Sequence, residues 1–250
     1  MTREQFNEIK ERLTKYREIR HLTYENQQAR FLGNVLEEVS EYFRAKNDLE
    51  RIDALCDIAV FCFNAFDFKY TKEIKLNKNY FSCIISDLAY LSKYLIDYLK
   101  EKEDIYNLDI SNKEKLLKLE GLEIRFKPFF QEHINNIINY IIYISKDLGF
   151  DFYKCMIETI KEIESKNIGN YCEYENKFYK MPGAYTLDEA YKLAFYRESN
   201  EPSLNGKTKP KLHKENNIMW TFKYKSALGG DMELNFIKWY KADYESCKLQ

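Results

Sequence analysis

The segment IDALCDIAVFCFNAF, residues 52–66, constrains the fold more than any other part of this sequence. On a helix its apolar side chains cover nearly the whole circumference, and a helix of this kind is normally buried among other elements. Asp53, Asp57 and Asn64 share the narrow stripe that is left. A buried carboxylate without a partner costs on the order of a few kcal/mol. The segment therefore predicts a multi-helix core in which the acidic stripe faces a partner.

The rest of the chain also favours helices, because its 250 residues include only 8 glycines and 4 prolines. Apolar periodicity predicts helices over 2–18, 26–46, 49–68, 78–103, 113–147, 151–166 and 187–198. Thr2 and Gln5 predict a capping box, and Pro128 must begin, bend or end a helix. The apolar stripe of the helix over 26–46 is Leu32, Val35, Leu36, Val39 and Phe43.

The last third of the chain has a different character. Residues 171–185 predict a loop or short hairpin, and 200–216 a basic loop. The tail from Ile218 fits either a strand pair or a closing helix. We therefore predict an all-α fold class with a small irregular or β-hairpin C-terminal part.

Composition narrows the classes of function. The 39 basic and 40 acidic residues give a formal net charge of -1, with no global attraction to nucleic acid or to an acidic membrane. The first residues lack the apolar core of a signal peptide, and no stretch approaches the ~18 apolar residues of a membrane span. We expect a cytoplasmic protein whose six cysteines are free thiols, with no membrane association and no nucleic-acid partner.

A second acidic stripe lies on the helix over 26–46. Glu37, Glu38 and Glu41 stand opposite its apolar face at i, i+3 and i, i+4 spacing. If this helix and the next one are antiparallel with facing stripes, up to five carboxylates meet in a groove. Oxygen ligands suit Mg²⁺, with Mn²⁺ as an alternative, and Mg²⁺ often accompanies a phosphorylated substrate. The alternatives are a solvated acidic face and pairing with basic residues of a neighbouring element.

Two short motifs resemble a known family. LEEVSEYFRA, residues 36–45, and DALCDIAVF, residues 53–61, resemble the all-α nucleoside triphosphate pyrophosphohydrolases, which include MazG-like proteins and dimeric dUTPases. The family pattern is ExxE on one helix and ExxD on the next. Glu38 and Glu41 match the first motif, Glu37 matches a glutamate that often precedes it, and Asp57 matches the final aspartate.

The second motif departs from the family pattern. Ala54 stands where the family has a glutamate, and Asp53 lies one position earlier. Glu50 and Asp53 form a literal ExxD, but it lies unusually close to Glu41 in the sequence. We prefer the pair Asp53 and Asp57, and the number of bound metal ions stays open.

The resemblance implies a fold, an activity and a site. The fold is a MazG-like four-helix core, built here from helices within 26–68 and 130–166 of a domain over 1–198, with residues 199–250 packing on the same domain. The activity is Mg²⁺-dependent hydrolysis of a (deoxy)nucleoside triphosphate to the monophosphate and pyrophosphate, in a homodimer or higher homo-oligomer. The implied catalytic residues are Glu37, Glu38 and Glu41, and the implied metal ligands are Glu38, Glu41, Asp53 and Asp57. The alternatives are a dUTP- or dUDP-specific hydrolase and a non-enzymatic helical module that binds a metal ion or a partner.

A weaker resemblance to phage-type MazG-like chains covers residues 148–180. It implies that Ser165, Lys166, Asn167 and Lys180 lie near the phosphates or the base. The substrate-binding candidates are therefore Lys166, Asn167 and Lys180, together with Asn64 of the acidic stripe. The alternative is that the three downstream residues are ordinary exposed loop residues. The segment KADYESC, residues 241–247, also looks like the end of such chains.

Overall fold

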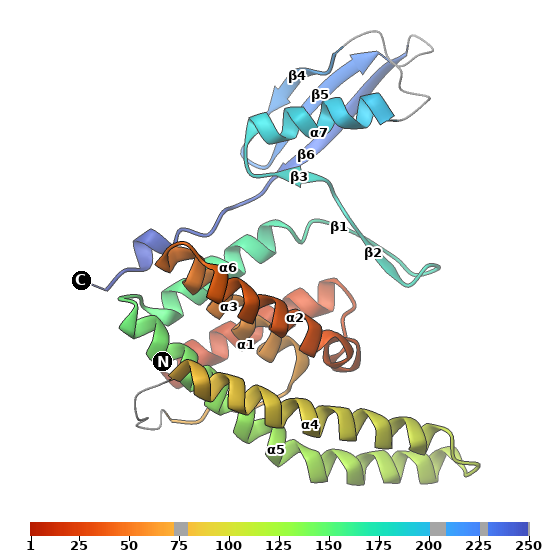
Figure 1. Ribbon diagram of the computed structural model, residues 1–250. Helices are drawn as coiled ribbons and strands as arrows, with labels where there is room; N and C mark the ends of the chain where they lie inside the picture. Colours follow the sequence, from red (N-terminus) through yellow and green to blue (C-terminus); the bar gives the residue numbers. More distant parts are fainter. Residues whose placement is uncertain (73–79, 201–208, 226–229, 250) are drawn as a thin grey trace. The chain divides into compact units, whose positions relative to one another are not determined.

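The computed structural model describes residues 1–72, 80–200, 209–225 and 230–249 (Figure 1). This part of the chain is mostly helical, with seven α-helices and a small C-terminal sheet. It forms two compact units. Unit 1 comprises Met1–Glu18, Leu22–Thr159 and Asp243–Gln250, and unit 2 comprises Ile19–His21 and Ile160–Ala242. The boundary expected between 198 and 199 falls inside a helix of unit 2.

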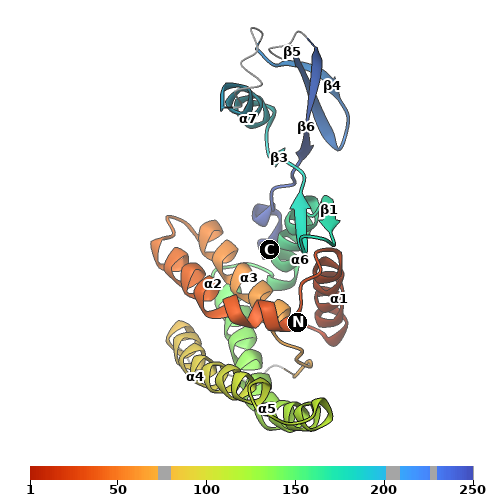
Figure 2. The same ribbon diagram turned by 90° about the vertical axis from the view of Figure 1, so that its right-hand side faces the viewer.

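Six helices supply most of unit 1. They are α1 (Arg3–Ile19), α2 (Tyr24–Arg44), α3 (Asp48–Ala65), α4 (Tyr80–Tyr106), α5 (Asn112–Asp147) and α6 (Phe152–Ser165), the last of which continues into unit 2. The periodicity predicted each of them to within a few residues. α2 packs against α3, and Figures 1 and 2 show α4 and α5 as a long antiparallel hairpin. Among the described residues, no helix is both long and apolar enough to cross a membrane.

Polar caps fix where the helices of unit 1 begin. The predicted capping box is confirmed, because the Gln5 amide donates to Thr2 Oγ1 at 3.2 Å and the Thr2 amide donates to Gln5 Oε1 at 2.8 Å. At the start of α3, the Asn47 side chain accepts from the Glu50 amide at 3.0 Å. Such caps satisfy amides that have no partner within the helix. Only residues 45–47 separate α2 from α3, so the chain reverses direction sharply there.

The apolar helix lies where its pattern predicts. Ile52, Leu55, Ile58, Ala59, Cys62, Phe63 and Phe66 of the segment 52–66 are all buried. The stripe predicted for α2 is wrong in part, since Leu36 and Phe43 are 61% and 68% exposed. The buried face follows Phe31, Val35 and Val39 at a spacing of four instead. The sequence offered two overlapping apolar stripes, and contact with α3 selects the one that contains Phe31.

Pro128 lies inside α5, which runs through it from Asn112 to Asp147. Proline removes one hydrogen bond of a helix and its ring presses on the carbonyl of residue 124. Buried residues on both sides of it, among them Phe126 and Phe130, tie this part of α5 into the core. Packing therefore outweighs the local preference for a break.

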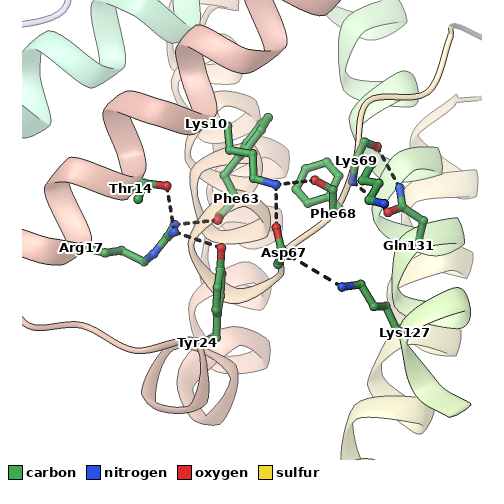
Figure 3. Close-up of polar contacts among 10 residues, drawn as sticks. All are labelled: Lys10, Thr14, Arg17, Tyr24, Phe63, Asp67, Phe68, Lys69, Lys127 and Gln131. Carbon is green, nitrogen blue, oxygen red and sulfur yellow. Dashed lines mark hydrogen bonds and ion pairs between the residues drawn. The ribbon is translucent and has the colours of Figure 1, made fainter. Parts of the chain in front are cut away.

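A polar network fastens the segment that follows α3 (Figure 3). The Lys10 ammonium donates to Asp67 Oδ1 at 2.6 Å and to the Phe68 carbonyl at 2.8 Å. The Gln131 side chain donates to the Lys69 carbonyl at 2.9 Å and accepts from the Lys69 amide at 2.8 Å. Unit 1 is thereby cross-linked from α1 through the end of α3 to α5.

Unit 2 contains a hairpin and a four-stranded sheet. The predicted short hairpin is confirmed as β1 (Gly169–Cys172) and β2 (Lys177–Lys180). The sheet has the order β3 (Gly183–Ala184), β6 (Asp231–Lys238), β5 (Met219–Lys225) and β4 (Lys211–Glu215). Helix α7 (Leu187–Asn200) lies against one face of it (Figure 2). The core between them is Ala184, Ala190, Ala194, Trp220, Phe222 and Phe236.

The sheet settles the structure of the tail, which the sequence left open, and corrects the structure expected for residues 200–216. The tail forms the strand pair β5 and β6, not a closing helix. The basic loop expected over 200–216 ends in a strand, since Lys211–Glu215 pairs with β5, while residues 201–208 lie outside the described residues. All five side chains of β4 are exposed, so an apolar pattern could not reveal it.

Candidate functional site

The acidic stripes of α2 and α3 meet at Glu38. Burial, together with the charges of Glu41, Asp53 and Glu37, raises the pKa of this half-buried carboxyl to about 7. Two of these neighbours lie on α2 and the third lies on α3. Four of the five predicted carboxylates therefore share one electrostatic environment.

The local fold explains this arrangement. Val35 and Val39 turn one side of α2 into the core, which leaves Glu38 at the margin of the contact with α3. The short connection after α2 sets α3 alongside it, so the first turns of α3 lie beside the last turns of α2. Asp53 stands in those first turns and comes close to Glu38.

Asp53 has a partner that the sequence did not reveal. The Tyr244 hydroxyl donates to Asp53 Oδ1 at 2.7 Å, across 191 residues of sequence. Asp57 lies one turn further along α3 and is half-buried. In the sequence, KADYESC stands out only as similar to the end of phage-type chains, and nothing in it connects Tyr244 with the acidic stripes.

The literal ExxD motif has a different use in this protein. The Glu50 carboxylate accepts from the Lys46 amide at 2.7 Å and from Asn47 Nδ2 at 3.2 Å, so it belongs to the cap of α3. Ala54 is 2% exposed and packs in the core. Asp53 is therefore the acid of this turn that faces the carboxylates of α2.

The donor chemistry of the four neighbouring carboxylates suits a hard cation such as Mg²⁺. Their spacing does not yet form a cage, because no three His, Cys, Asp or Glu side chains of the described residues converge closely enough to hold a metal ion. The side chains thus fit the chemistry of a divalent cation and would have to turn toward one another to bind it.

Asn64 lies deeper on the same stripe, at 4% exposure. Its Oδ1 accepts from Arg17 at 3.4 Å. Figure 3 shows that Arg17 also donates to the Phe63 carbonyl at 3.0 Å and to the Tyr24 hydroxyl at 3.0 Å. The structure therefore places Asn64 with a buried arginine of α1, and not with the carboxylates of α2.

Two of the predicted substrate-binding lysines come together in unit 2. We call Arg20, Lys166 and Lys180 the basic cluster, because burial lowers the pKa of Lys180 and the charges of Lys166 and Arg20 lower it further. The Lys180 ammonium lies 4.2 Å from the centre of the Trp239 ring. In the described part of the chain Lys180 has no acidic partner. The sequence had not drawn attention to Arg20 or Trp239.

Lys166 is more strongly engaged than Lys180. Its ammonium lies 2.6 Å from Glu162 Oε1. Burial acts to lower the pKa of Lys166, but its hydrogen bonds with Glu162 and Tyr185 outweigh burial and raise the pKa above its ordinary value. Asn167 Oδ1 is buried and has no hydrogen-bond partner among the described residues. Lys180 is therefore the member of this group that is best placed to attract an anion.

A cavity of about 130 Å³ lies elsewhere in unit 1, lined by Tyr24, Gln28, Phe66, Tyr98 and Phe130 among other residues. The charged groups at its edge are already paired, as Glu25 with Lys102, Asp67 with Lys127 and Glu123 with Tyr98. The carboxylates of α2 and α3 are the stronger candidate. The chain matches no protein-family model, no curated protein and no solved structure, so its function has to be argued from its own residues.

Proposed function

We propose that unit 1 carries a Mg²⁺-dependent hydrolase that converts a (deoxy)nucleoside triphosphate to the monophosphate and pyrophosphate. The observation that carries this proposal is that acids of two helices, Glu37 and Glu41 of α2 and Asp53 of α3, place their negative charges around Glu38. Such a concentration is costly unless a cation offsets it. The motifs LEEVSE and DALCD, which supply these acids, are those that resemble the pyrophosphohydrolases.

Glu38, Glu41, Asp53 and Asp57 are the residues that would hold the cation. A bound Mg²⁺ supplies positive charge for the phosphate oxygens and lowers the pKa of a coordinated water. Glu37 or Glu41 would orient the attacking water and accept its proton. Because the pKa of Glu38 is about 7, part of the metal-free protein is protonated there at neutral pH. Cation binding then releases a proton, and the cation affinity rises with pH.

Lys166, Asn167 and Lys180 remain the proposed substrate-binding residues. A triphosphate carries several negative charges, and fixed ammonium groups stabilise the charge that develops as the anhydride bond breaks. Of these residues, Lys180 has cationic neighbours and, among the described residues, no acidic partner. We therefore propose Lys180 as the principal phosphate-binding residue of the three.

The experiment that tests this function is an assay with a panel of (d)NTPs and dUDP, with Mg²⁺ or with EDTA, in which chromatography separates the products. We expect pyrophosphate and the monophosphate in the presence of Mg²⁺ only. Turnover of dUTP and dUDP alone would indicate the dUTP-specific alternative. Cation binding without turnover of any nucleotide would support the alternative of a non-enzymatic module.

A matched pair of variants ties the activity to the site. Glu38→Gln keeps the shape of the side chain and removes its charge, so we expect activity to fall at least about a hundredfold. Glu25→Gln makes the same change on the same helix, at an acid that pairs with Lys102 instead, and should retain activity. Full activity in Glu38→Gln would refute the assignment of the site.

A further inference from the structure

The indole ring of Trp239 is held in one position by its neighbours in unit 2. The Trp239 amide, directly after β6, donates to the Ala184 carbonyl at 2.9 Å. Gly183 allows the ring to come close, because a Cβ there would lie 2.1 Å from Trp239 Nε1. The Tyr185 ring meets the indole at an angle of 77°, with the ring centres 5.5 Å apart. The half-buried Trp239 therefore forms a fixed aromatic surface.

The Lys180 ammonium lies over this ring, 4.2 Å from its centre. A cation is attracted to an aromatic face within about 6 Å of the ring centre, so this is a close contact. The backbone of Lys180 is fixed as well, since it pairs with Gly169 at the end of the β1–β2 hairpin. The amide of the next residue, Met181, donates to the Ile168 carbonyl at 2.8 Å. Lys180 is thus restrained at both its backbone and its ammonium group.

The contact with Trp239 does not cancel the charge of Lys180, because a ring attracts an ammonium group without carrying a net negative charge. The acid of the same network, Glu162, is occupied by other donors. It accepts from the Lys166 ammonium at 2.6 Å and from the Tyr185 hydroxyl. Lys180 itself is exposed and, among the described residues, has no acidic partner. An anion from solution can therefore reach a cation that is already in place.

A restrained ammonium group suits a multiply charged anion, because less side-chain freedom is lost when the anion binds. We propose that Trp239 is a positioning residue that holds Lys180 for a diphosphate group, and that this site binds inorganic pyrophosphate without a metal ion. The proposal deepens the function proposed above, on which it rests for the role of Lys180. It adds Trp239, and with it a binding step in unit 2 that needs no cation.

The first test is calorimetric titration of the full chain with inorganic pyrophosphate, in EDTA and at constant ionic strength. Lys180→Met should raise the dissociation constant of pyrophosphate about tenfold, as expected for the loss of one charge-assisted hydrogen bond. The matched control is Lys177→Met. Lys177 is an exposed lysine of the same strand, and its ammonium also lies over an aromatic ring, 5.0 Å from the centre of Tyr179. This control should bind pyrophosphate as the wild type does.

A double-mutant cycle tests whether Trp239 acts through Lys180. Trp239→Leu should raise the dissociation constant of pyrophosphate about three- to tenfold, because Lys180 then has to be ordered on binding. In a Lys180→Met background the same substitution should change it by less than about twofold. Trp239→Phe keeps an aromatic face and should recover part of the affinity that Trp239→Leu loses. Thermal unfolding followed by circular dichroism shows that each variant is folded.

Fluorescence supplies a readout that a purely structural role of Trp239 would not change. The chain has two tryptophans, and Trp220 lies in the core between α7 and the sheet. Trp220→Phe therefore leaves Trp239 as the only tryptophan. In this variant pyrophosphate should change the emission saturably, with the dissociation constant found by calorimetry, and should not change it once Lys180→Met is added.

Three results would overturn the proposal: a wild type that binds no pyrophosphate in EDTA, a Lys180→Met variant within twofold of the wild type, or an equal loss from Trp239→Leu in both backgrounds. Pyrophosphate binding that depends on Trp239 and Lys180, in a protein with no hydrolase activity, would refute the proposed reaction and leave this inference standing. Mg²⁺-dependent hydrolysis by a protein that binds no pyrophosphate in EDTA would do the reverse.

Discussion

Because negative charges surround the half-buried Glu38, we predict that a conservative substitution of Glu38 stabilises the metal-free protein at neutral and alkaline pH. In the folded protein the pKa of Glu38 is raised from 4.5 to about 7. A carboxyl whose folded pKa lies above its unfolded pKa favours folding below pH 4.5, and this contribution is lost as the pH rises through 7. Glu38→Gln has no proton to lose, so its stability should lack this decline.

The magnitude follows from the pKa difference. A change from 4.5 to about 7 corresponds to at most about 3.4 kcal/mol. Glu38 is only half-buried, so solvent screening reduces the effect to about 1 to 2 kcal/mol. For a chain of this size that is about 2 to 8 °C in the midpoint of thermal unfolding. We expect Glu38→Gln to exceed the wild type by this amount at pH 8, and to equal it at pH 4.

The assay is thermal unfolding followed by circular dichroism, at pH values from 4 to 8 in EDTA. Glu25→Gln is the control with the opposite sign. A backbone hydrogen bond at the start of α2 lowers the pKa of Glu25 in the folded protein, with smaller effects of Thr23 and Lys102. That variant should be less stable than the wild type at pH 8. A Glu38→Gln variant that is destabilised at pH 8, or whose advantage does not change with pH, would refute the electrostatic reasoning.

Three further predictions concern unit 2 and the helix α2. In steady-state kinetics, Lys180→Met should raise KM for the triphosphate about tenfold with a smaller effect on kcat, as expected for the loss of one charge-assisted contact. The control is Lys192→Met on the exposed face of α7, which should change neither KM nor kcat. Gly183→Ala should destabilise unit 2, because a Cβ there would lie 2.1 Å from Nε1 of Trp239. Gly33→Ala should stabilise unit 1 by about 0.5 to 1 kcal/mol in thermal unfolding, since in the described part of the chain its Cβ would meet no heavy atom within 4 Å.

Local patterns predicted the helices and most of the carboxylate group. The periodicity of α3 required burial, and Ile52, Leu55 and Ile58 are indeed fully buried. Spacing along α2 placed Glu37, Glu38 and Glu41 on one face. These features depend on neighbours within a turn or two of helix, which a sequence displays directly.

Other features depend on contacts between distant parts of the chain. Leu36 of α2 matches an apolar pattern as well as Val35 does, and only the position of α3 leaves it exposed. The contact between Tyr244 and Asp53 joins residues 191 apart, and no periodicity relates them. Strand β4 presents only exposed side chains, so its pairing with β5 provides the evidence for it. Such features follow from tertiary structure and not from propensity.

The polar stripe of α3 shows how an almost wholly apolar helix accommodates charge. Asp53 near its start is exposed, Asp57 one turn later is half-buried, and Asn64 near its end is buried. The residue type thus changes with depth, from two carboxylates to a neutral amide that accepts from Arg17. Both carboxylates therefore lie where water still reaches them. The accessible end of this stripe lies beside a carboxyl whose pKa is raised to about 7, and so the acids assigned to the proposed cation site do not stabilise the fold at neutral pH.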